Sequence, residues 1–221
     1  GISLMQEGIS YLVGLKLPAV IVNVVRGGPG LGSIMPSQGD YYQSTRGGGH
    51  GDYRTPVLAP FSVQEMADLM DDAWDIAFKY RTPVLMMSDG MIGQMMEKVR
   101  LNDYQERNSE EFIKENYDWA ITGKQEGKER IIQKSVELDS EKKEKWHKEL
   151  IETYKEIEEK EVRFEKQYCD DAELIIIAFG SAARITEKAI ELAREKNFKV
   201  GLLRPITLWP FPSKEILSLA E

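Results

Sequence analysis

Two positions in the sequence have side chains and surroundings that suit ligand chemistry. Arg26 directly follows a short apolar run, and His50 lies in the segment GGGHGDY, two residues before Asp52. A guanidinium can bind a carboxylate through two parallel hydrogen bonds, and its charge does not titrate. Histidine is suited to proton transfer near neutral pH, and neighbouring glycines let the backbone approach a ligand closely. Arg26 and His50 are therefore candidate functional residues.

Each candidate also has a purely structural interpretation. Two acids of the same loop, Asp40 and Asp52, are alternative partners for the guanidinium of Arg26. A loop histidine such as His50 often does no more than form a hydrogen bond within its own turn. We expect His147 to be solvated, because it falls in a segment dense in charged residues. Two histidines so far apart are weak support for a metal, so we predict no metal site in this chain.

The glycines around Arg26 do not fit the common phosphate-binding motifs. Gly30 and Gly32 give G-x-G, but Met35 replaces the third glycine of the dinucleotide fingerprint. Pro36 follows at once, so no helix starts there. The motif G-x-x-x-x-G-K-[ST] does not occur in the chain. We therefore do not expect either motif to bind a nucleotide.

Asp89 follows an apolar run and has two interpretations. It can cap the element that follows, or it can begin a diphosphate–magnesium motif of the thiamine type. That motif requires Gly-Asp-Gly, whereas the triplet here is Ser88-Asp89-Gly90. We therefore interpret Asp89 as a capping residue.

Composition excludes several classes of protein. The chain of 221 residues has a net charge of −8 and no basic segment, so we expect no nucleic-acid partner. Its apolar runs are far shorter than the ~20 residues of a membrane span, and no secretory leader is evident. We therefore expect a cytoplasmic protein without membrane contact. The single cysteine, Cys169, excludes an internal disulfide and a cysteine-ligated iron–sulfur cluster held by this chain alone.

The elements before the glycine-rich loop begin an α/β pattern. A helix is predicted over Ile2–Leu15, with its buried face formed by Leu4, Met5, Tyr11, Leu12 and Leu15. Ala19–Val25 is a nearly continuous β-branched run, typical of a strand covered on both faces of a parallel sheet. The glycine-rich loop covers residues 26–61. Loops of this length are usually functional or disordered.

The elements after the loop continue the pattern. Ser62 and Glu65 have the spacing of a capping box at the start of a helix over Val63–Lys79. A second buried strand over Pro83–Ser88 follows, and then a helix over Asp89–Val99. Alternation of strands and helices predicts an α/β fold with a parallel sheet.

The next segment is polar, and a second α/β unit follows it. Within residues 101–170, a helix over Glu141–Glu165 carries i,i+4 charge pairs and a narrow apolar stripe of Trp146, Leu150, Tyr154, Ile157 and Phe164. It is either a solvated arm packed by one thin face or a docking helix for a partner. From Asp171 the pattern gives a strand, an amphipathic helix, a strand (KVGLLR), a proline-rich connector (PITLWPFP) and a helix capped by Ser213. The chain starts within the body of a predicted helix and ends in a helix without a C-cap glycine, so we expect a fragment of a longer protein.

Two long stretches carry a resemblance to a known family. GISLMQEGISYL…LPAVIVNVVRGGPG and GGGHGDYRTPVLAPFSVQEMADLMDDAWDIAFKYRTPVLMMSDG resemble the α subunit of 2-oxoacid:ferredoxin oxidoreductases. DDAELIIIAFGSAARITEKAIELAREKNFKVGLLRPITLWPFP is similar to the second domain of that subunit. The likeness covers most of the chain in the right order, and the glycine loop is closer to the branched-chain (2-ketoisovalerate) members.

The resemblance implies a fold and a domain division. Residues 1–100 would form part of a pyrimidine-type thiamine diphosphate domain, with residues 101–170 as a polar linker with a charged helix. Residues 171–221 would form part of a Rossmann-like, transketolase C-terminal-type domain. Both domains would be truncated.

The resemblance also implies an activity. Members of the family oxidatively decarboxylate a 2-oxoacid with coenzyme A to acyl-CoA and CO₂, and reduce ferredoxin. Thiamine diphosphate would be shared with a β subunit that carries the diphosphate half-site and Mg²⁺. Iron–sulfur clusters would lie on partner subunits, which include γ and ferredoxin-like subunits. The family's thiamine glutamate is expected upstream of Gly1, so this fragment would be inactive alone.

Individual residues match family positions. Arg26 falls where the family's arginine binds the substrate carboxylate, and His50 and Asp52 match a His-Gly-acid stretch close to the active site. Gly27, Gly28 and Arg46 are implied as cofactor-binding residues. Two alternatives remain at this point: a non-catalytic interaction subunit, and another thiamine-dependent enzyme of the transketolase or decarboxylase kind.

Overall fold

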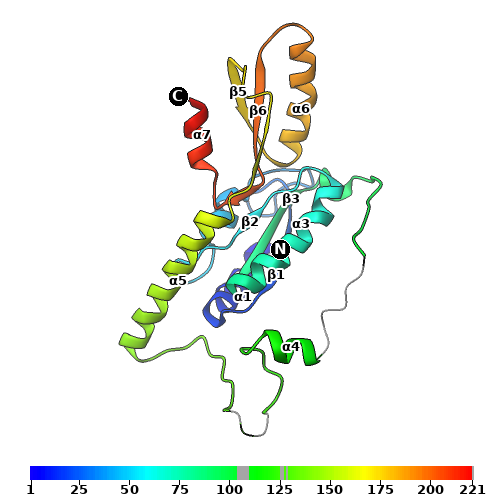
Figure 1. The fold of residues 1–221 in the computed structure, drawn as a ribbon. Coiled ribbons are helices and arrows are strands. Elements are labelled where there is room, and N and C mark those ends of the chain that lie inside the picture. Colours follow the sequence, from blue (N-terminus) through cyan, green and yellow to red (C-terminus); the bar gives the residue numbers. More distant parts are fainter. Residues whose placement is uncertain (104–109, 125–126, 128, 221) are drawn as a thin grey trace.

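The computed structural model describes residues 1–103, 110–124, 127 and 129–220, and it contains two sheets (Figure 1). The first sheet has four strands in the order β1-β3-β2-β7: Ala19–Val25, Pro83–Asp89, Val57–Leu58 and Thr207–Trp209. The second has three strands in the order β4-β6-β5: Phe164–Gln167, Val200–Pro205 and Leu174–Ile177. This mixed α/β architecture confirms the predicted fold class.

The predicted parallel sheet forms around strand β3. β1 and β3 pair in parallel in register from Ala19↔Pro83 to Val25↔Asp89, and β2 pairs in parallel on the other side of β3. Every residue of β3 is buried, as its apolar sequence predicts. The carboxyl ends of β1 and β3 therefore meet at one edge of the sheet, where Arg26 and Asp89 lie.

Two helices cover this sheet. α1 (Ile2–Leu15) ends at Lys16, which adopts a left-handed conformation, and α3 (Val63–Tyr80) ends in the same way at Arg81. At the start of α3 the Ser62 hydroxyl accepts a hydrogen bond from the Glu65 N–H at 3.1 Å, so the predicted cap is confirmed. The predicted face of α3 packs against the sheet, with Leu69, Ala73, Ile76 and Ala77 buried.

Two sequence predictions about the faces of these elements are wrong. In α1 the buried residues are Ile2, Gln6, Ile9 and Val13, whereas Leu4, Met5 and Tyr11 are exposed. In β1 the alternating burial leaves Val22 and Val24 about half exposed, so one face of the strand is not covered as predicted. β1 stands at the edge of the sheet, where the neighbouring elements reach only part of it.

The segment after β3 is less regular than predicted. Only Ile92–Gln94 (η1) forms a short 3₁₀ turn, so the helix predicted over Asp89–Val99 is wrong. α4 (Glu110–Asn116) follows beyond residues 104–109, which lie outside the described part of the chain. Gly90 and Gly93 both lie at the start of this segment, and glycine in a helix interior costs about 1 kcal/mol relative to alanine.

The long charged helix is α5 (Ser140–Lys160), which begins with Asp139 accepting hydrogen bonds from two backbone N–H groups. Its thin apolar face packs on the core through Leu150 and Ile157, as expected for a solvated arm. The helix ends before Phe164, which lies in β4 instead of on the predicted stripe. The chain turns there because Phe164 pairs with Pro205 across the second sheet.

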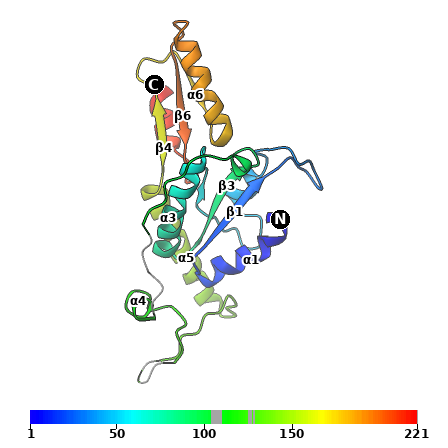
Figure 2. The ribbon, with the colours of Figure 1, turned by 90° about the vertical axis from the view of Figure 1, so that its right-hand side faces the viewer.

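The second sheet carries α6 (Gly180–Arg194) on one side, and α7 (Ser213–Ala220) ends the described chain (Figures 1 and 2). β4 falls within the segment predicted as a linker. The segment PITLWPFP is not only a connector, since it contains β7, which pairs antiparallel with β2 of the first sheet. Two strands therefore lie across the predicted domain boundaries.

A buried charge cluster joins the second sheet to the start of α3. Arg204 of β6, 3% exposed, donates hydrogen bonds to both oxygens of Glu65 at 2.9 Å and to Glu165 at 2.6 Å. Its guanidinium also lies 3.9 Å from the centre of the Phe61 ring. Because a buried guanidinium is costly unless its N–H groups are satisfied, these partners fix β6 against the start of α3.

None of the helices in the described part of the chain is long and apolar enough to cross a membrane.

Candidate functional site

Arg26 lies at the carboxyl end of β1, at the entrance to a compact turn. It forms an isolated antiparallel bridge with Pro36, and the Gly27 N–H donates to the Met35 carbonyl at 2.9 Å. At Gly32, with φ of 63°, a Cβ would lie 1.9 Å from the Gly27 carbonyl oxygen. Glycine is therefore required where the turn crosses itself. Residues 26–36 are an ordered hairpin-like turn.

The Arg26 guanidinium helps to hold this turn. Its Nη1 donates to the carbonyl of Ser33 at 3.1 Å and to the carbonyl of Leu31. It pairs with neither Asp40 nor Asp52, so the expected ion pair within the loop is not formed. Asp40 instead accepts from the Asn23 side chain at 3.3 Å. Among the described residues, Nε and Nη2 of Arg26 have no hydrogen-bond acceptor, so one edge of the guanidinium is available to a carboxylate.

The second candidate segment follows α2 (Tyr41–Arg46). His50, Asp52 and Arg46 are all exposed, and the guanidinium of Arg46 lies 4.6 Å from the centre of the Tyr42 ring. The His50 imidazole forms no hydrogen bond with any described residue, so the expected bond within its own turn is absent. Asp52 has φ of 54°, in the left-handed region.

Contacts bring this segment to the same end of the sheet as Arg26. Gln43 of α2 donates to the Ser3 hydroxyl at 3.2 Å, and the Gly48 N–H donates to Gln6 at 3.1 Å. Ser3 and Gln6 belong to the first turns of α1. Because α1 runs antiparallel to β1, its start lies near the carboxyl end of the strand (Figure 2). The structure thus places Arg26 and the His50 segment at one edge of the sheet, without a hydrogen bond or ion pair between them.

Asp89 has two structural roles, of which the sequence indicated one. One carboxylate oxygen accepts from the backbone of Met91 at 2.9 Å and Ile92 at 3.2 Å, which confirms the capping role. The other accepts from the Ser181 N–H at 3.3 Å, at the start of α6. The Gln38 amide donates to the Phe179 carbonyl at 2.8 Å beside it. The cavity between them, about 10 Å³, has room for one water at most, so this junction is structural.

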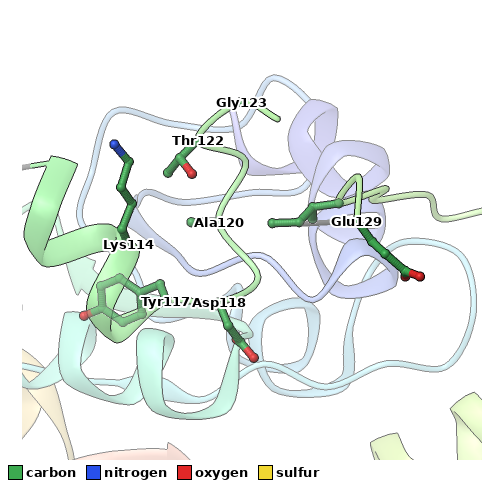
Figure 3. Close-up of a pocket in the computed structure, with 8 residues that line it drawn as sticks. Lys114, Tyr117, Asp118, Ala120, Thr122, Gly123 and Glu129 are labelled. Carbon is green, nitrogen blue, oxygen red and sulfur yellow. The ribbon is translucent and has the colours of Figure 1, made fainter. Parts of the chain in front are cut away.

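A larger pocket of about 350 Å³ lies away from these residues (Figure 3). It is lined by the loop after α4, and Lys114, Asp118 and Glu129 contribute its charged groups. In Figure 3 these charged ends point in different directions and do not converge on one point. None of the predicted site residues lines it. In the described part of the chain, no group of three or more His, Cys, Asp or Glu side chains is arranged to hold a metal ion.

Comparisons with known proteins place the chain in a family. The family profile described as "Pyruvate flavodoxin/ferredoxin oxidoreductase, thiamine diP-bdg" matches residues 1–170, and "Pyruvate:ferredoxin oxidoreductase core domain II" matches residues 172–221. The chain is 49% identical to ketoisovalerate oxidoreductase subunit VorB of Methanothermobacter thermautotrophicus, over all of this chain and 61% of the relative. It is 36% identical to 2-oxoglutarate synthase subunit KorA of Methanocaldococcus jannaschii, over 96% of this chain and 62% of the relative.

A solved structure shows the same fold. The 2-oxoglutarate:ferredoxin oxidoreductase of Magnetococcus marinus, with 2-oxoglutarate, coenzyme A and succinyl-CoA bound, superposes with a TM-score of 0.78 at 21% identity. The likeness covers 99% of this chain and 42% of the other. The chain spans about three fifths of the length of the curated relatives named above. On the match of the thiamine diphosphate-binding profile over residues 1–170, the chain belongs to the pyruvate flavodoxin/ferredoxin oxidoreductase family, the 2-oxoacid:ferredoxin oxidoreductases that its sequence resembles.

Proposed function

We propose that the full-length protein is the α subunit of an enzyme that oxidatively decarboxylates a 2-oxoacid with coenzyme A. The products are an acyl-CoA, CO₂ and reduced ferredoxin. The observation that carries this proposal is the 49% identity to a ketoisovalerate oxidoreductase subunit across the whole chain. Because the identity to 2-oxoglutarate synthase subunits is lower, at 36%, the proposed substrate is a branched-chain 2-oxoacid.

The proposed cofactor is thiamine diphosphate, shared with a β subunit. When bound, it supplies the carbanion chemistry of the decarboxylation. Residues 1–170 match the thiamine diphosphate-binding profile, and donors suited to an anionic substrate lie at the carboxyl edge of β1. The diphosphate half-site and its Mg²⁺ are assigned to the β subunit. Since this chain has one cysteine, the iron–sulfur clusters are assigned to γ and ferredoxin-like subunits.

Within this chain, the proposed role of Arg26 is to bind the carboxylate of the 2-oxoacid. Its Nε and Nη2 edge can donate two parallel hydrogen bonds, while Nη1 holds the turn that shapes the site. His50 and Asp52 are proposed to approach the substrate from the exposed segment after α2. Gly27, Gly28 and Arg46 are proposed to contact the cofactor. The guanidinium fixes the carboxylate and so orients the 2-oxo group for reaction.

The proposed domain division is the one predicted from the sequence, with a pyrimidine-type domain over residues 1–100, a linker over 101–170 and a second domain over 171–221. β4 then comes from the linker and pairs with β6 of the second domain, whereas β7 comes from the second domain and pairs with β2 of the first. These two strands connect the domains. We also propose a cytoplasmic location for the complex, in keeping with an acidic chain with one cysteine.

The test is an assay of the full-length protein purified with its partner subunits. Viologen reduction is followed with 3-methyl-2-oxobutanoate, pyruvate and 2-oxoglutarate, each with and without coenzyme A. The proposal predicts reduction that depends on both coenzyme A and the 2-oxoacid. An intact complex that reduces viologen with none of the three would contradict it and would favour a non-catalytic interaction subunit.

A further inference from the structure

Two of the three consecutive glycines before His50, Gly48 and Gly49, pack closely against the first turns of α1. A Cβ on Gly48 would lie 2.7 Å from Cδ of the Gln6 side chain, and one on Gly49 would lie 2.4 Å from the Gln6 backbone oxygen. Both distances are shorter than any normal carbon contact. These glycines therefore serve close packing of the segment on Gln6.

Gln6 and Tyr53 fasten the segment with a closed set of hydrogen bonds. The Gln6 side-chain oxygen accepts from the Gly48 N–H at 3.1 Å and from the Tyr53 hydroxyl at 2.9 Å. The Tyr53 hydroxyl in turn accepts from the Gly49 N–H at 3.2 Å. Burial raises the pKa of the Tyr53 phenol above its ordinary value, although the Gly49 and Gly48 backbone bonds lower it. The hydroxyl therefore keeps its proton and remains a donor to Gln6.

Both side chains are buried, which makes these bonds difficult to replace by water. Gln6 is 7% exposed and Tyr53 is 3% exposed. A buried polar group that loses its partner costs more than the bond itself is worth, because water does not reach it. Gln6 is a polar residue on the face of α1 that otherwise buries Ile2, Ile9 and Val13. The burial of this polar side chain is explained by the hydrogen bonds that it accepts from Gly48 and Tyr53.

The two fastened points stand on either side of an exposed tip. Gly49 and Tyr53 are anchored, and His50, Gly51 and Asp52 lie between them and are all exposed. Gly51 has φ of 102° and Asp52 has φ of 54°. Backbone conformations of this kind persist when the surrounding structure over-determines them, and they occur often at functional sites. The anchors supply that constraint at both ends of a three-residue tip.

We propose that Gln6 and Tyr53 are positioning residues that hold the tip His50–Asp52 in one conformation for the reaction of the 2-oxoacid. This inference rests on the proposed function. Gln6 and Tyr53 act through the tip and do not themselves contact the substrate. Loss of the anchors leaves the tip attached but free to sample other conformations, so fewer molecules present His50 and Asp52 correctly.

The test uses the full-length enzyme with its partner subunits and three variants. Tyr53→Phe removes the hydroxyl that serves Gly49 and Gln6, and Gln6→Met removes the acceptor while keeping the size of the side chain. Gln6→Glu keeps an acceptor oxygen on a side chain of the same length and is the conservative variant. Tyr80→Phe is the matched control, because Tyr80 is a buried tyrosine whose hydroxyl bonds to Glu161 at 2.8 Å, away from the tip.

We expect kcat/KM for the 2-oxoacid to fall about tenfold in Tyr53→Phe and Gln6→Met, a factor typical of a lost pair of hydrogen bonds. Rates are normalised to the amount of bound thiamine diphosphate, so that a lower yield of folded enzyme does not lower the measured rate. The KM for coenzyme A and the rates of Tyr80→Phe are expected to stay at wild-type values. Gln6→Glu is expected to recover most of the lost rate. Hydrogen exchange over residues 47–52 is expected to rise in Tyr53→Phe and Gln6→Met alone.

Unchanged hydrogen exchange over residues 47–52 in Tyr53→Phe would overturn the inference. So would faster exchange with unchanged kcat/KM, because the order of the tip would then have no effect on the reaction. Failure of Gln6→Glu to recover any rate would show that the acceptor is not the relevant group. A wild-type enzyme that does not turn over any 2-oxoacid would overturn both the proposed function and this inference. If the wild-type enzyme is active and Tyr53→Phe and Gln6→Met keep its kcat/KM, the inference alone is overturned.

Discussion

Arg26 holds its own turn with one part of its side chain, and the rest is proposed to bind the substrate. One guanidinium nitrogen holds the carbonyls of Leu31 and Ser33, and the opposite edge has no acceptor among the described residues. A side chain already fixed by its own loop loses little further freedom when it binds a ligand. This arrangement suits a residue that binds a small carboxylate at a strand end.

Replacing Arg26 by lysine tests this double role. Lysine keeps the positive charge and can donate to one carbonyl, but it cannot make two parallel hydrogen bonds to a carboxylate. We expect the KM for the 2-oxoacid to rise at least about tenfold, since a charge-assisted bond is worth ~1.5–3 kcal/mol. Subunit assembly, measured by size-exclusion chromatography, is expected to be unchanged.

Arg130→Lys is the matched control for this prediction, because Arg130 is an exposed arginine outside the candidate site. An Arg26→Lys enzyme with wild-type KM and kcat would show that the guanidinium serves only the turn.

The glycines before His50 give a second prediction at the residue scale. The added methyl of Gly48→Ala meets the end of the Gln6 side chain, whereas that of Gly49→Ala meets the Gln6 backbone. In a Gln6→Ala background, Gly48→Ala is therefore expected to cost almost nothing further, while Gly49→Ala keeps its full cost. The measurement is the melting temperature of the three single and two double variants beside wild type. If the changes in melting temperature add both for Gln6→Ala with Gly48→Ala and for Gln6→Ala with Gly49→Ala, the contact between Gly48 and the Gln6 side chain is contradicted.

The position of Arg26 at the carboxyl end of a strand could be predicted from the sequence. Arg26 follows a strand, and parallel strands place such residues at a ligand-binding edge. The role of Gln6 could not be predicted, because a single glutamine in a helix carries no signal of which loop will pack on it 42 residues later in the chain. Its burial depends on tertiary contacts that sequence periodicity does not contain.

At the scale of elements, the start of α3 and strand β6 depend on each other through Arg204. Arg204→Met leaves the carboxylates of Glu65 and Glu165 without their cation in a mostly buried place. Removal of one partner from a buried ion cluster typically costs ~3–5 kcal/mol. Because Glu165 is 41% exposed, we expect a loss near the lower end, about 3 kcal/mol.

Urea unfolding of the full-length subunit measures this loss. Arg184→Met serves as control, since Arg184 also pairs with a carboxylate, Glu97, but both side chains are partly exposed. A loss of stability no larger than that of the control would contradict a buried cluster at this junction.

The same cluster predicts a dependence on pH. Burial alone would raise the pKa of Glu165, but hydrogen bonds from Arg204 and Gln167 bring it below its ordinary value. A carboxyl with a lowered pKa in the folded state stabilises the protein at pH values above its ordinary, unfolded pKa of 4.5. This stabilisation is lost as the pH falls through the folded pKa. The melting temperature of wild type is therefore expected to fall more steeply between pH 6 and 3 than that of Glu165→Gln. Parallel curves would contradict the assignment.

The elements show where sequence patterns succeed and where they do not. β3 is buried along its whole length and its apolar run predicts this, and the cap of α3 follows from Ser62 and Glu65. The exposed face of β1 and the strand β7 were not predicted. Edge position and pairing between distant segments, such as Val57 with Trp209, are set by topology and leave no local pattern.

At the scale of the whole molecule, the chain spans about three fifths of the length of the relatives it matches. The profile matches follow one another from residue 1 to 170 and from 172 to 221, and the relatives are longer than this chain. Arg26 and the exposed tip lie at an edge of the sheet, and this position fits the proposal that another subunit completes the site. Recognition of the family from long stretches of sequence was confirmed, because such stretches carry far more information than a glycine motif.

The full-length enzyme is proposed to oxidise a branched-chain 2-oxoacid with coenzyme A. The most direct measurement is a competition in which 3-methyl-2-oxobutanoate, pyruvate and 2-oxoglutarate are supplied together at equal concentrations to the assembled enzyme with an electron acceptor. The acyl-CoA products are then measured by mass spectrometry, so their ratio reports the ratio of kcat/KM values. We predict that isobutyryl-CoA dominates the products. Formation of succinyl-CoA or acetyl-CoA as the main product would contradict the proposed substrate, and formation of no acyl-CoA would contradict the proposed reaction.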